Sequence, residues 1–279
     1  MRAGLTRRGL LLGGLAVCTS VAACGAQERE QVPVPYVPAT PDPPAPPPVP
    51  VSARRVYSAA RGSEVDLVVI APEGVPIAGL PVCLALHGKG SNARGFADLG
   101  VPAMLSEVVD AGTPPFALVA LDGAHYWVDV DGGDDPLRML VDELPGWLAD
   151  TELGAPAAAL GISMGAFGAL RYAREQRDMK AIAACSPALF VDWPDAEARE
   201  VFANESQWES HEPLRHTAEL GRAEIGVWCG EDDPFAGAAR KLVQATTPAR
   251  AEIGPGEHDE SYWTSAMPEI LRFVGARLA

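Results

Sequence analysis

The stretch Gly161-Ile162-Ser163-Met164-Gly165 decides how the rest of the sequence is interpreted, because its serine stands between two glycines. An apolar run over residues 157–162 predicts a buried strand before the serine, and small residues with helical spacing follow over 164–174. A strand that turns directly into a helix brings backbone atoms together, and glycine two places either side removes the Cβ atoms that would clash. The serine hydroxyl is then exposed at a helix N-terminus, where partial positive charge favours a developing anion. Ser163 is therefore the candidate nucleophile.

Short apolar runs alternate with longer amphipathic segments from residue 54 onward, which is the pattern of a parallel sheet covered by helices. Runs such as Leu67-Val68-Val69-Ile70 suit strands that are buried on both faces. The expected strands are residues 65–70, 82–87, 117–121, 157–162, 180–185 and 225–229, and the expected helices are 136–150, 164–174 and 236–244. The predicted class is α/β, with a mainly parallel central sheet and helices on both faces. Together with the serine motif, this class predicts an α/β-hydrolase fold.

A base must accompany Ser163, because a serine hydroxyl is too weak an acid to attack a carbonyl unaided. In the predicted fold, an acid and then a histidine follow the serine along the chain. His258, in a glycine-rich loop, is the candidate base, and Asp233, after the strand expected at 225–229, is the candidate acid that fixes its tautomer. Glu231 and Asp232 remain rivals of Asp233.

Four other histidines compete with His258 for the role of base. His211 and His216 fall in a polar segment, where solvated surface is the default interpretation, and His87 and His125 precede the serine, which is the wrong order. The order along the chain therefore favours His258.

Two backbone N–H groups are needed to bind the oxyanion that forms when serine attacks. One is the amide of Met164, directly after the nucleophile. The other should come from the loop after an early strand, and residues 86–90, Leu-His-Gly-Lys-Gly, fit this position. The amide of Lys89 is our candidate, with those of Gly88 and Gly90 as alternatives.

The first 24 residues have the composition of a signal peptide that ends in a lipobox. Basic residues up to Arg8 precede an apolar stretch over 9–17, and Val21-Ala22-Ala23-Cys24 follows. The apolar stretch is shorter than the roughly 20 residues of a membrane-spanning helix. Resemblance to bacterial lipoproteins implies a lipid on the Cys24 thiol and cleavage before it. Paired arginines at 7–8 also resemble a twin-arginine export signal. We expect an exported protein, lipid-anchored to the outer face of the cell membrane.

A proline-rich segment separates this anchor from the rest of the chain. Residues 33–50 contain ten prolines without a Gly-X-Y period, which favours an extended spacer. We therefore expect a linker over residues 25–53 and one hydrolase domain over 54–279.

Residues 187–222 are longer than an ordinary connection and hold Trp193, Phe202 and Trp208 among many acids. Long loops in compact domains are usually functional, so this segment is a candidate small cap over the site. The alternative is a surface helical insertion whose aromatic side chains pack on the body.

Charge and ligand spacing limit the partners of the chain. Beyond residue 24 it carries 19 basic and 37 acidic residues, a net charge of −18, which repels nucleic acid and anionic lipid head groups. We therefore expect no nucleic-acid partner, and membrane contact only through Cys24.

The acidic loop 129–135 lacks the spacing of an EF-hand, which predicts a solvated loop and not a calcium site. Three cysteines, Cys83, Cys185 and Cys229, lie in apolar runs without zinc-ligand spacing, so neither a metal nor a cofactor is expected.

Taken together, the chain resembles the esterase family that includes esterase D, or S-formylglutathione hydrolase, and the secreted mycobacterial mycolyltransferases. The similarity spans residues 82–273 and is carried by residues 86–88, 122–123, 126–127, 142–144, 161–165, 186–189, 230, 233–235, 258–259 and 262–263. In that family the acid lies three residues after the glycine and two before the phenylalanine, which selects Asp233 over Asp232.

The resemblance implies a serine-dependent carboxylic ester hydrolase that acts through an acyl-Ser163 intermediate on a small-molecule or lipid ester of the envelope or the extracellular space. Transfer of the acyl group to a sugar or lipid alcohol, as in the mycolyltransferases, is the alternative. A third hypothesis is a tethered binding protein without catalysis. Nothing in the sequence indicates the oligomeric state.

Overall fold

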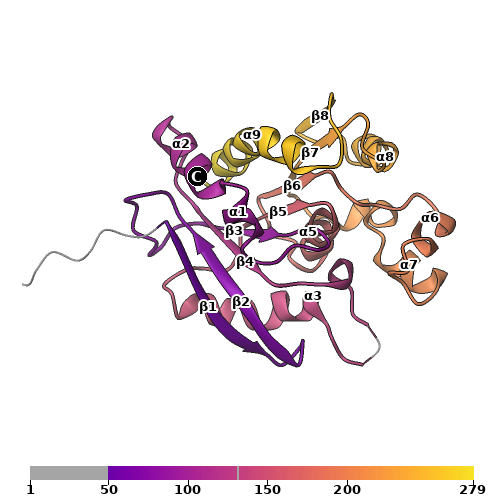
Figure 1. Cartoon of the computed structure of the whole chain (residues 1–279), viewed down its shortest axis with the longest axis horizontal. Coiled ribbons are helices and arrows are strands. Elements are labelled where there is room, and N and C mark those ends of the chain that lie inside the picture. The colour runs from indigo at the N-terminus through magenta and orange to yellow at the C-terminus, as the bar shows by residue number, and fades with distance from the viewer. Residues whose placement is uncertain (1–49, 131) are drawn as a thin grey trace, which may run out of the picture. The chain divides into compact units, whose positions relative to one another are not determined.

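One sheet organises the part of the chain that the computed structural model describes, residues 50–130 and 132–279 (Figure 1). In these residues eight strands form the sheet, in the order β1-β2-β4-β3-β5-β6-β7-β8. The strands are β1 (Val51–Ser58), β2 (Ser63–Ile70), β3 (Val82–Leu86), β4 (Ala117–Leu121), β5 (Ala158–Ile162), β6 (Ala181–Cys185), β7 (Glu224–Gly230) and β8 (Arg250–Gly254). β1 and β2 pair antiparallel with each other, and β2 pairs antiparallel with β4, while the other six strands run parallel.

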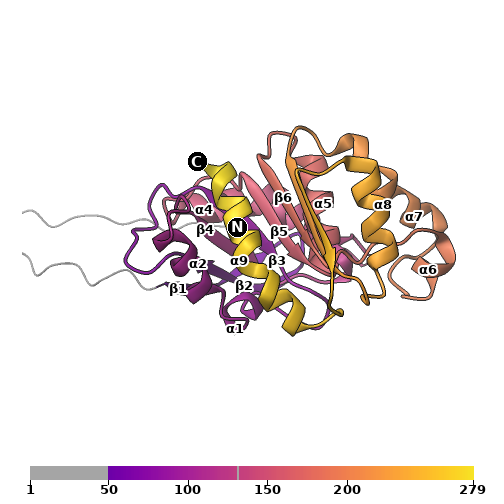
Figure 2. The same ribbon diagram turned by 90° about the horizontal axis from the view of Figure 1, so that it is seen from above.

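Helices cover both faces of the sheet, because alternate residues of each buried strand point to opposite sides. In β3, Leu84 and Leu86 join the core that α4, α5 and α8 cover, whereas Cys83 and Ala85 join the core under α1, α2 and α9. Figure 2 shows α9 lying across the strands on the side of α1 and α2. The helices are α1 (Gly95–Asp98), α2 (Val101–Asp110), α3 (Pro136–Arg138), α4 (Leu144–Ala149), α5 (Met164–Glu175), α6 (Trp193–Glu197), α7 (Glu205–His211), α8 (Ala236–Thr246) and α9 (Glu260–Leu278). This architecture confirms the predicted fold class.

The sheet order places a crevice at the carboxyl ends of β3 and β5. The chain passes from β3 to β4 on one side, and then to β5 on the other side of β3. Loops that leave two neighbouring parallel strands in opposite directions open a crevice, which is the usual position of a site in such sheets. The loop after β3 and the turn after β5 are the two stretches that contain Lys89 and Ser163.

The segment expected as one helix over 136–150 is divided in the structure. A π-helical turn, η2 (Met139–Glu143), separates α3 from α4. Pro145 stands in the first turn of α4 and has no N–H to donate, so the regular i to i−4 pattern is interrupted there.

The N-terminal predictions, which are the signal peptide over 1–24, the lipid on Cys24 and most of the linker over 25–53, lie outside the described residues. The first strand begins at Val51, three residues before the expected start of the domain. Among the described helices none is long and apolar enough to cross a membrane.

Candidate active site

The turn between β5 and α5 holds Ser163 in a strained backbone conformation. Its φ is 56° and its ψ is −119°, outside the regions that non-glycine residues favour. A Cβ on Gly161 would overlap the carbonyl of Gly165, and a Cβ on Gly165 would overlap the carbonyl of Leu86 in β3. Glycine is therefore sterically required on both sides of this serine, and the strain is confined to the residue that presents its hydroxyl.

Three side chains from three separate segments form a continuous hydrogen-bonded row. The Nε2 atom of His258 lies 2.9 Å from the Oγ of Ser163, and its Nδ1 lies 2.7 Å from Oδ2 of Asp233. Asp233 follows β7, and His258 lies in the loop between β8 and α9. The rivals Glu231 and Asp232 are exposed, whereas the side chain of Asp233 is fully buried. The structure thus brings together the serine, acid and histidine that the sequence singled out.

The environment of Asp233 favours its ionised form. Burial by itself raises the pKa of this carboxyl, but hydrogen bonds from His258 and the Phe235 amide, and the charge of a protonated His258, hold the pKa below its usual value. The Phe235 amide donates to Oδ1 at 2.8 Å, so both oxygens are bonded. A carboxylate fixed in this way orients the imidazole and stabilises its protonated form.

Two further residues, Trp263 and Ser186, support the histidine; both belong to stretches that carry the family resemblance, which by itself assigned neither of them a role. The indole of Trp263 stands edge-on to the ring of His258, with centroids 5.3 Å apart. Its Nε1 donates to Oγ of Ser186 at 3.1 Å, and Ser186 is fully buried with a φ of 46°. The ring of Phe235 also packs against His258, with centroids 5.3 Å apart.

The loop after β3 lies directly against the serine. A Cβ added to Gly88 would come within 3.4 Å of the Cβ of Ser163. In residues 50–130 and 132–279, the amides of Lys89 and Met164 donate to no backbone carbonyl. The two amides therefore remain the candidate oxyanion donors.

A cavity of about 690 Å³ opens beside Ser163 and His258, large enough for a small-molecule substrate. Its apolar wall includes Tyr126, Phe235 and Trp263. Lys89 and Arg199 supply positive charge, and Asp98 and Glu260 supply negative charge. The cavity therefore offers both apolar and charged groups to a ligand.

Residues 187–222 touch this cavity through Arg199, whose guanidinium lies 5.0 Å from the ring centroid of Phe235. The aromatic residues of the segment instead pack on the body of the domain. Phe202 lies 6.0 Å from Phe167 of α5, and Trp208 is buried and donates to the carboxylate of Glu212. The segment therefore contributes one polar side chain to the cavity and otherwise acts as a packed insertion.

The described carboxylates of the acidic loop 129–135 are engaged by protein groups. Asp134 binds Arg61, Asp135 accepts the Arg138 amide, and Asp129 lies 3.4 Å from His211. Asp131 lies outside the described residues. Across residues 50–130 and 132–279 no group of three or more metal-ligating side chains is found. The three cysteines Cys83, Cys185 and Cys229 are buried and free, in agreement with their apolar sequence context.

A family model described as "Putative esterase" matches residues 58–274. No curated protein sequence matches the chain directly.

Solved structures of esterases and hydrolases resemble the fold. A ferulic acid esterase is 21% identical, with a TM-score of 0.69 over 82% of this chain and 98% of that one. An S-formylglutathione hydrolase from Agrobacterium tumefaciens is 17% identical, with a TM-score of 0.69 over 82% of this chain and 95% of that one. MPT51 (FbpC1) of Mycobacterium tuberculosis is 19% identical, with a TM-score of 0.68 over 83% of this chain and the whole of that one. At these identities the similarity shows the α/β-hydrolase fold alone.

Proposed function

The chain belongs to the esterase family, and we propose that it is a serine-dependent carboxylic ester hydrolase that acts through an acyl-Ser163 intermediate. The observation that carries the proposal is the row Asp233, His258 and Ser163, with contacts of 2.7 Å and 2.9 Å, at the wall of a cavity. Family membership supports ester hydrolysis or acyl transfer, and the row of side chains supports a serine mechanism.

In the first step, Oγ of Ser163 attacks the carbonyl carbon of the ester while Nε2 of His258 takes the hydroxyl proton. The tetrahedral intermediate carries a negative oxygen, for which the amides of Lys89 and Met164 are the proposed donors. When the intermediate collapses, the bond to the leaving oxygen breaks and His258 returns the proton to that oxygen. An alcohol leaves and the acyl group remains on Ser163.

In the second step, a water molecule attacks the acyl carbon while His258 takes one of its protons. Collapse of the second intermediate breaks the bond to Oγ of Ser163, which regains its proton from His258, and the carboxylic acid leaves. Asp233 stays ionised throughout and stabilises the protonated imidazole. The lowered pKa of Asp233 supports this role.

Labelling with a fluorophosphonate tests the nucleophile. We expect rapid labelling of the wild type and none of Ser163→Ala, because the reagent forms a bond to an activated serine oxygen. Ser265→Ala is the matched control, since Ser265 is exposed on α9 and bonds the carbonyl of Tyr262. Labelling that survives Ser163→Ala would overturn the serine assignment. Neither labelling nor hydrolysis in the wild type would favour a binding protein.

Acyl transfer to a sugar or lipid alcohol is the second candidate, because it uses the same acyl-enzyme and only the acceptor differs. The cavity has polar groups, Lys89 and Glu260, near which an acceptor hydroxyl could bind. Product analysis with trehalose or glycerol present distinguishes the two reactions. Free acid as the sole product argues for hydrolysis, and a new ester argues for transfer.

We also propose that the protein is exported and held at the outer face of the cell membrane by a lipid on Cys24. The support is the sequence of residues 1–24. Metabolic labelling with a palmitate analogue should mark the wild type and not Cys24→Ala, which should appear in the soluble fraction. An unlabelled wild-type protein in the soluble fraction would contradict the anchor.

A further inference from the structure

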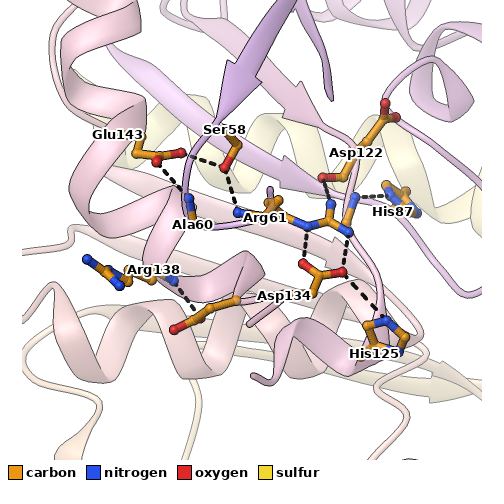
Figure 3. Close-up of polar contacts among 11 residues, drawn as sticks. Ser58, Ala60, Arg61, His87, Asp122, His125, Asp134, Arg138 and Glu143 are labelled. Atoms are coloured by element: carbon orange, nitrogen blue, oxygen red, sulfur yellow. Dashed lines mark hydrogen bonds and ion pairs between the residues drawn. The ribbon is translucent and has the colours of Figure 1, made fainter. Parts of the chain in front are cut away.

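A row of hydrogen bonds leads from Arg61 to the loop that carries the Lys89 amide (Figure 3). Arg61 Nη1 donates to the carbonyl of Asp122 at 2.8 Å. The next amide, that of Gly123, donates to Nε2 of His87 at 3.0 Å, and Nδ1 of His87 lies 2.8 Å from the carbonyl of Gly88. None of these groups belongs to the row of Asp233, His258 and Ser163.

The contacts fix which nitrogen of His87 carries the proton. The Gly123 amide can only donate, so Nε2 accepts, and Nδ1 must carry the hydrogen that bonds the Gly88 carbonyl. Burial is the largest influence on the pKa of His87 and lowers it. The imidazole packs edge-on against the indole of Trp127, with ring centroids 5.6 Å apart. His87 is therefore a neutral imidazole with one fixed tautomer.

Every link of this row donates in the same direction. In a trans peptide the C=O and N–H bonds point in opposite directions. In the peptide between Asp122 and Gly123, the carbonyl accepts from Arg61 and the N–H donates to His87. In the peptide between Gly88 and Lys89, the carbonyl accepts from His87, so the Lys89 N–H points away from that ring. Hydrogen bonds aligned in this way polarise one another. A positive guanidinium at one end therefore strengthens the N–H donor at the other.

The guanidinium is held firmly in place. The side chain of Arg61 is 9% exposed, and its Nε and Nη2 bond the two oxygens of Asp134 at 2.5 Å and 3.0 Å. The backbone of Arg61 lies in the turn between β1 and β2. The carboxylate of Glu143 holds this turn, because it accepts hydrogen bonds from the Ser58 hydroxyl at 2.5 Å and from the Ala60 amide at 2.9 Å. The Arg61 amide also donates to Oγ of Ser58 at 3.1 Å.

We propose that Arg61 is a positioning residue for the oxyanion site, and that it orients and polarises the Lys89 amide through Asp122, Gly123, His87 and Gly88. This inference rests on the proposed function, because the oxyanion forms only in that reaction. Arg61 acts through other groups and touches no substrate.

The principal variant is Arg61→Gln, assayed in the purified full chain with p-nitrophenyl acetate. Removal of a whole oxyanion donor lowers kcat by roughly 100-fold to 1,000-fold, so loss of its orienting charge should lower kcat by about 10-fold with little change in KM. Arg61→Lys keeps a charged donor and should recover part of this loss. Arg138→Gln is the matched control, because Arg138 is exposed and its side chain pairs with Asp142 within the same helical segment.

Asp134→Asn separates this role from a merely structural ion pair. It removes the negative partner of Arg61 but leaves the guanidinium bonded to the Asp122 carbonyl. The proposal expects kcat within about twofold of wild type for Asp134→Asn. Equal losses in Asp134→Asn and Arg61→Gln, or a loss in Arg61→Gln no greater than in Arg138→Gln, would overturn it.

The Nδ1 proton of His87, observed by NMR, gives a readout that does not depend on catalysis. In the wild type this proton should resonate downfield, assigned by its loss in His87→Asn, and it should move upfield in Arg61→Gln. An unchanged resonance would overturn the proposal even if kcat falls. Should the wild type fail to hydrolyse esters, the proposed function fails, while this resonance still tests the row. If Arg61→Gln does not fold, the same comparison is made with Arg61→Lys, with a smaller shift expected.

Discussion

Two histidines, His258 and His87, line the same cavity as Ser163 and hold the same tautomer for different purposes. Each has its proton on Nδ1 and accepts a hydrogen bond at Nε2. Nδ1 of His258 faces the carboxylate of Asp233, which orients the ring and stabilises the imidazolium that forms during the proposed reaction. Nδ1 of His87 faces the neutral carbonyl of Gly88, and its pKa is lowered because it is buried.

The difference shows that the group opposite Nδ1 determines what a histidine can do. The carboxylate of Asp233 makes His258 suited to carry a proton during the reaction. The side chain of His258 remains 21% exposed beside the cavity. A carbonyl and burial keep His87 neutral, so it can only orient its neighbours. Four predictions test this contrast, from the largest expected effect to the smallest.

Replacement of the base should have the largest effect. We expect His258→Ala to lower kcat on the order of 10⁶-fold, since the proton of Ser163 then has no acceptor. Steady-state hydrolysis of p-nitrophenyl acetate and the rate of fluorophosphonate labelling measure the loss. A variant that labels as fast as the wild type would remove His258 from the mechanism.

Replacement of the acid should have the second largest effect. Asp233→Asn is expected to lower kcat about 10⁴-fold, because an amide there favours the wrong tautomer of His258. Asp232→Asn is the matched control, since Asp232 is exposed. If Asp232→Asn proved the more damaging of the two in the same assay, the acid would be misassigned.

Loss of the second histidine should be smaller and of another kind. His87→Ala should lower kcat by about 100-fold, because the peptide between Gly88 and Lys89 is no longer held. In His87→Asn the side-chain amide can still donate to the Gly88 carbonyl, so more activity should remain. The pH dependence of kcat should keep its midpoint in both variants. A shifted midpoint would mean that His87 takes part in proton transfer.

The smallest effect concerns the pH dependence of stability. Because the pKa of His87 is lower in the folded protein, the unfolded chain binds more protons below its own pKa of about 6.5, and stability falls as the pH falls below that value. His87→Asn should reduce this fall. Urea denaturation from pH 7.5 to 5 measures the free energy of unfolding at each pH. A slope identical to that of the wild type would show that His87 is not held neutral.

Sequence patterns located the central strands well and the edge strands not at all. β4 and β5 were found within one residue, because strands buried on both faces are continuous apolar runs. β8 was missed because its residues are exposed or half-buried and include Arg250 and Glu252. β1 was missed for the same reason, and its start was assigned to the linker.

The candidate site divides in a similar way. The glycines around Ser163 act on atoms within a few residues, so the sequence was sufficient to predict that turn. Trp263 and Ser186 lie in stretches that carry the family resemblance, but their roles depend on a contact between segments 77 residues apart, which the spacing of residues does not predict. The segment 187–222 was ambiguous, because aromatic content is the same whether the rings face a cavity or pack on α5.

The sequence by itself determined strand β5, the turn that carries Ser163, and the order in which serine, acid and histidine follow one another along the chain. The reason is that burial and backbone sterics are local and leave a pattern in neighbouring residues. The tertiary structure alone decided that Arg61 contacts Asp122, 61 residues away, and that His87 joins Gly123 to Gly88. These contacts depend on the sheet order, which places β4 beside β3, and the order of strands in space is not written in the spacing of residues along the chain.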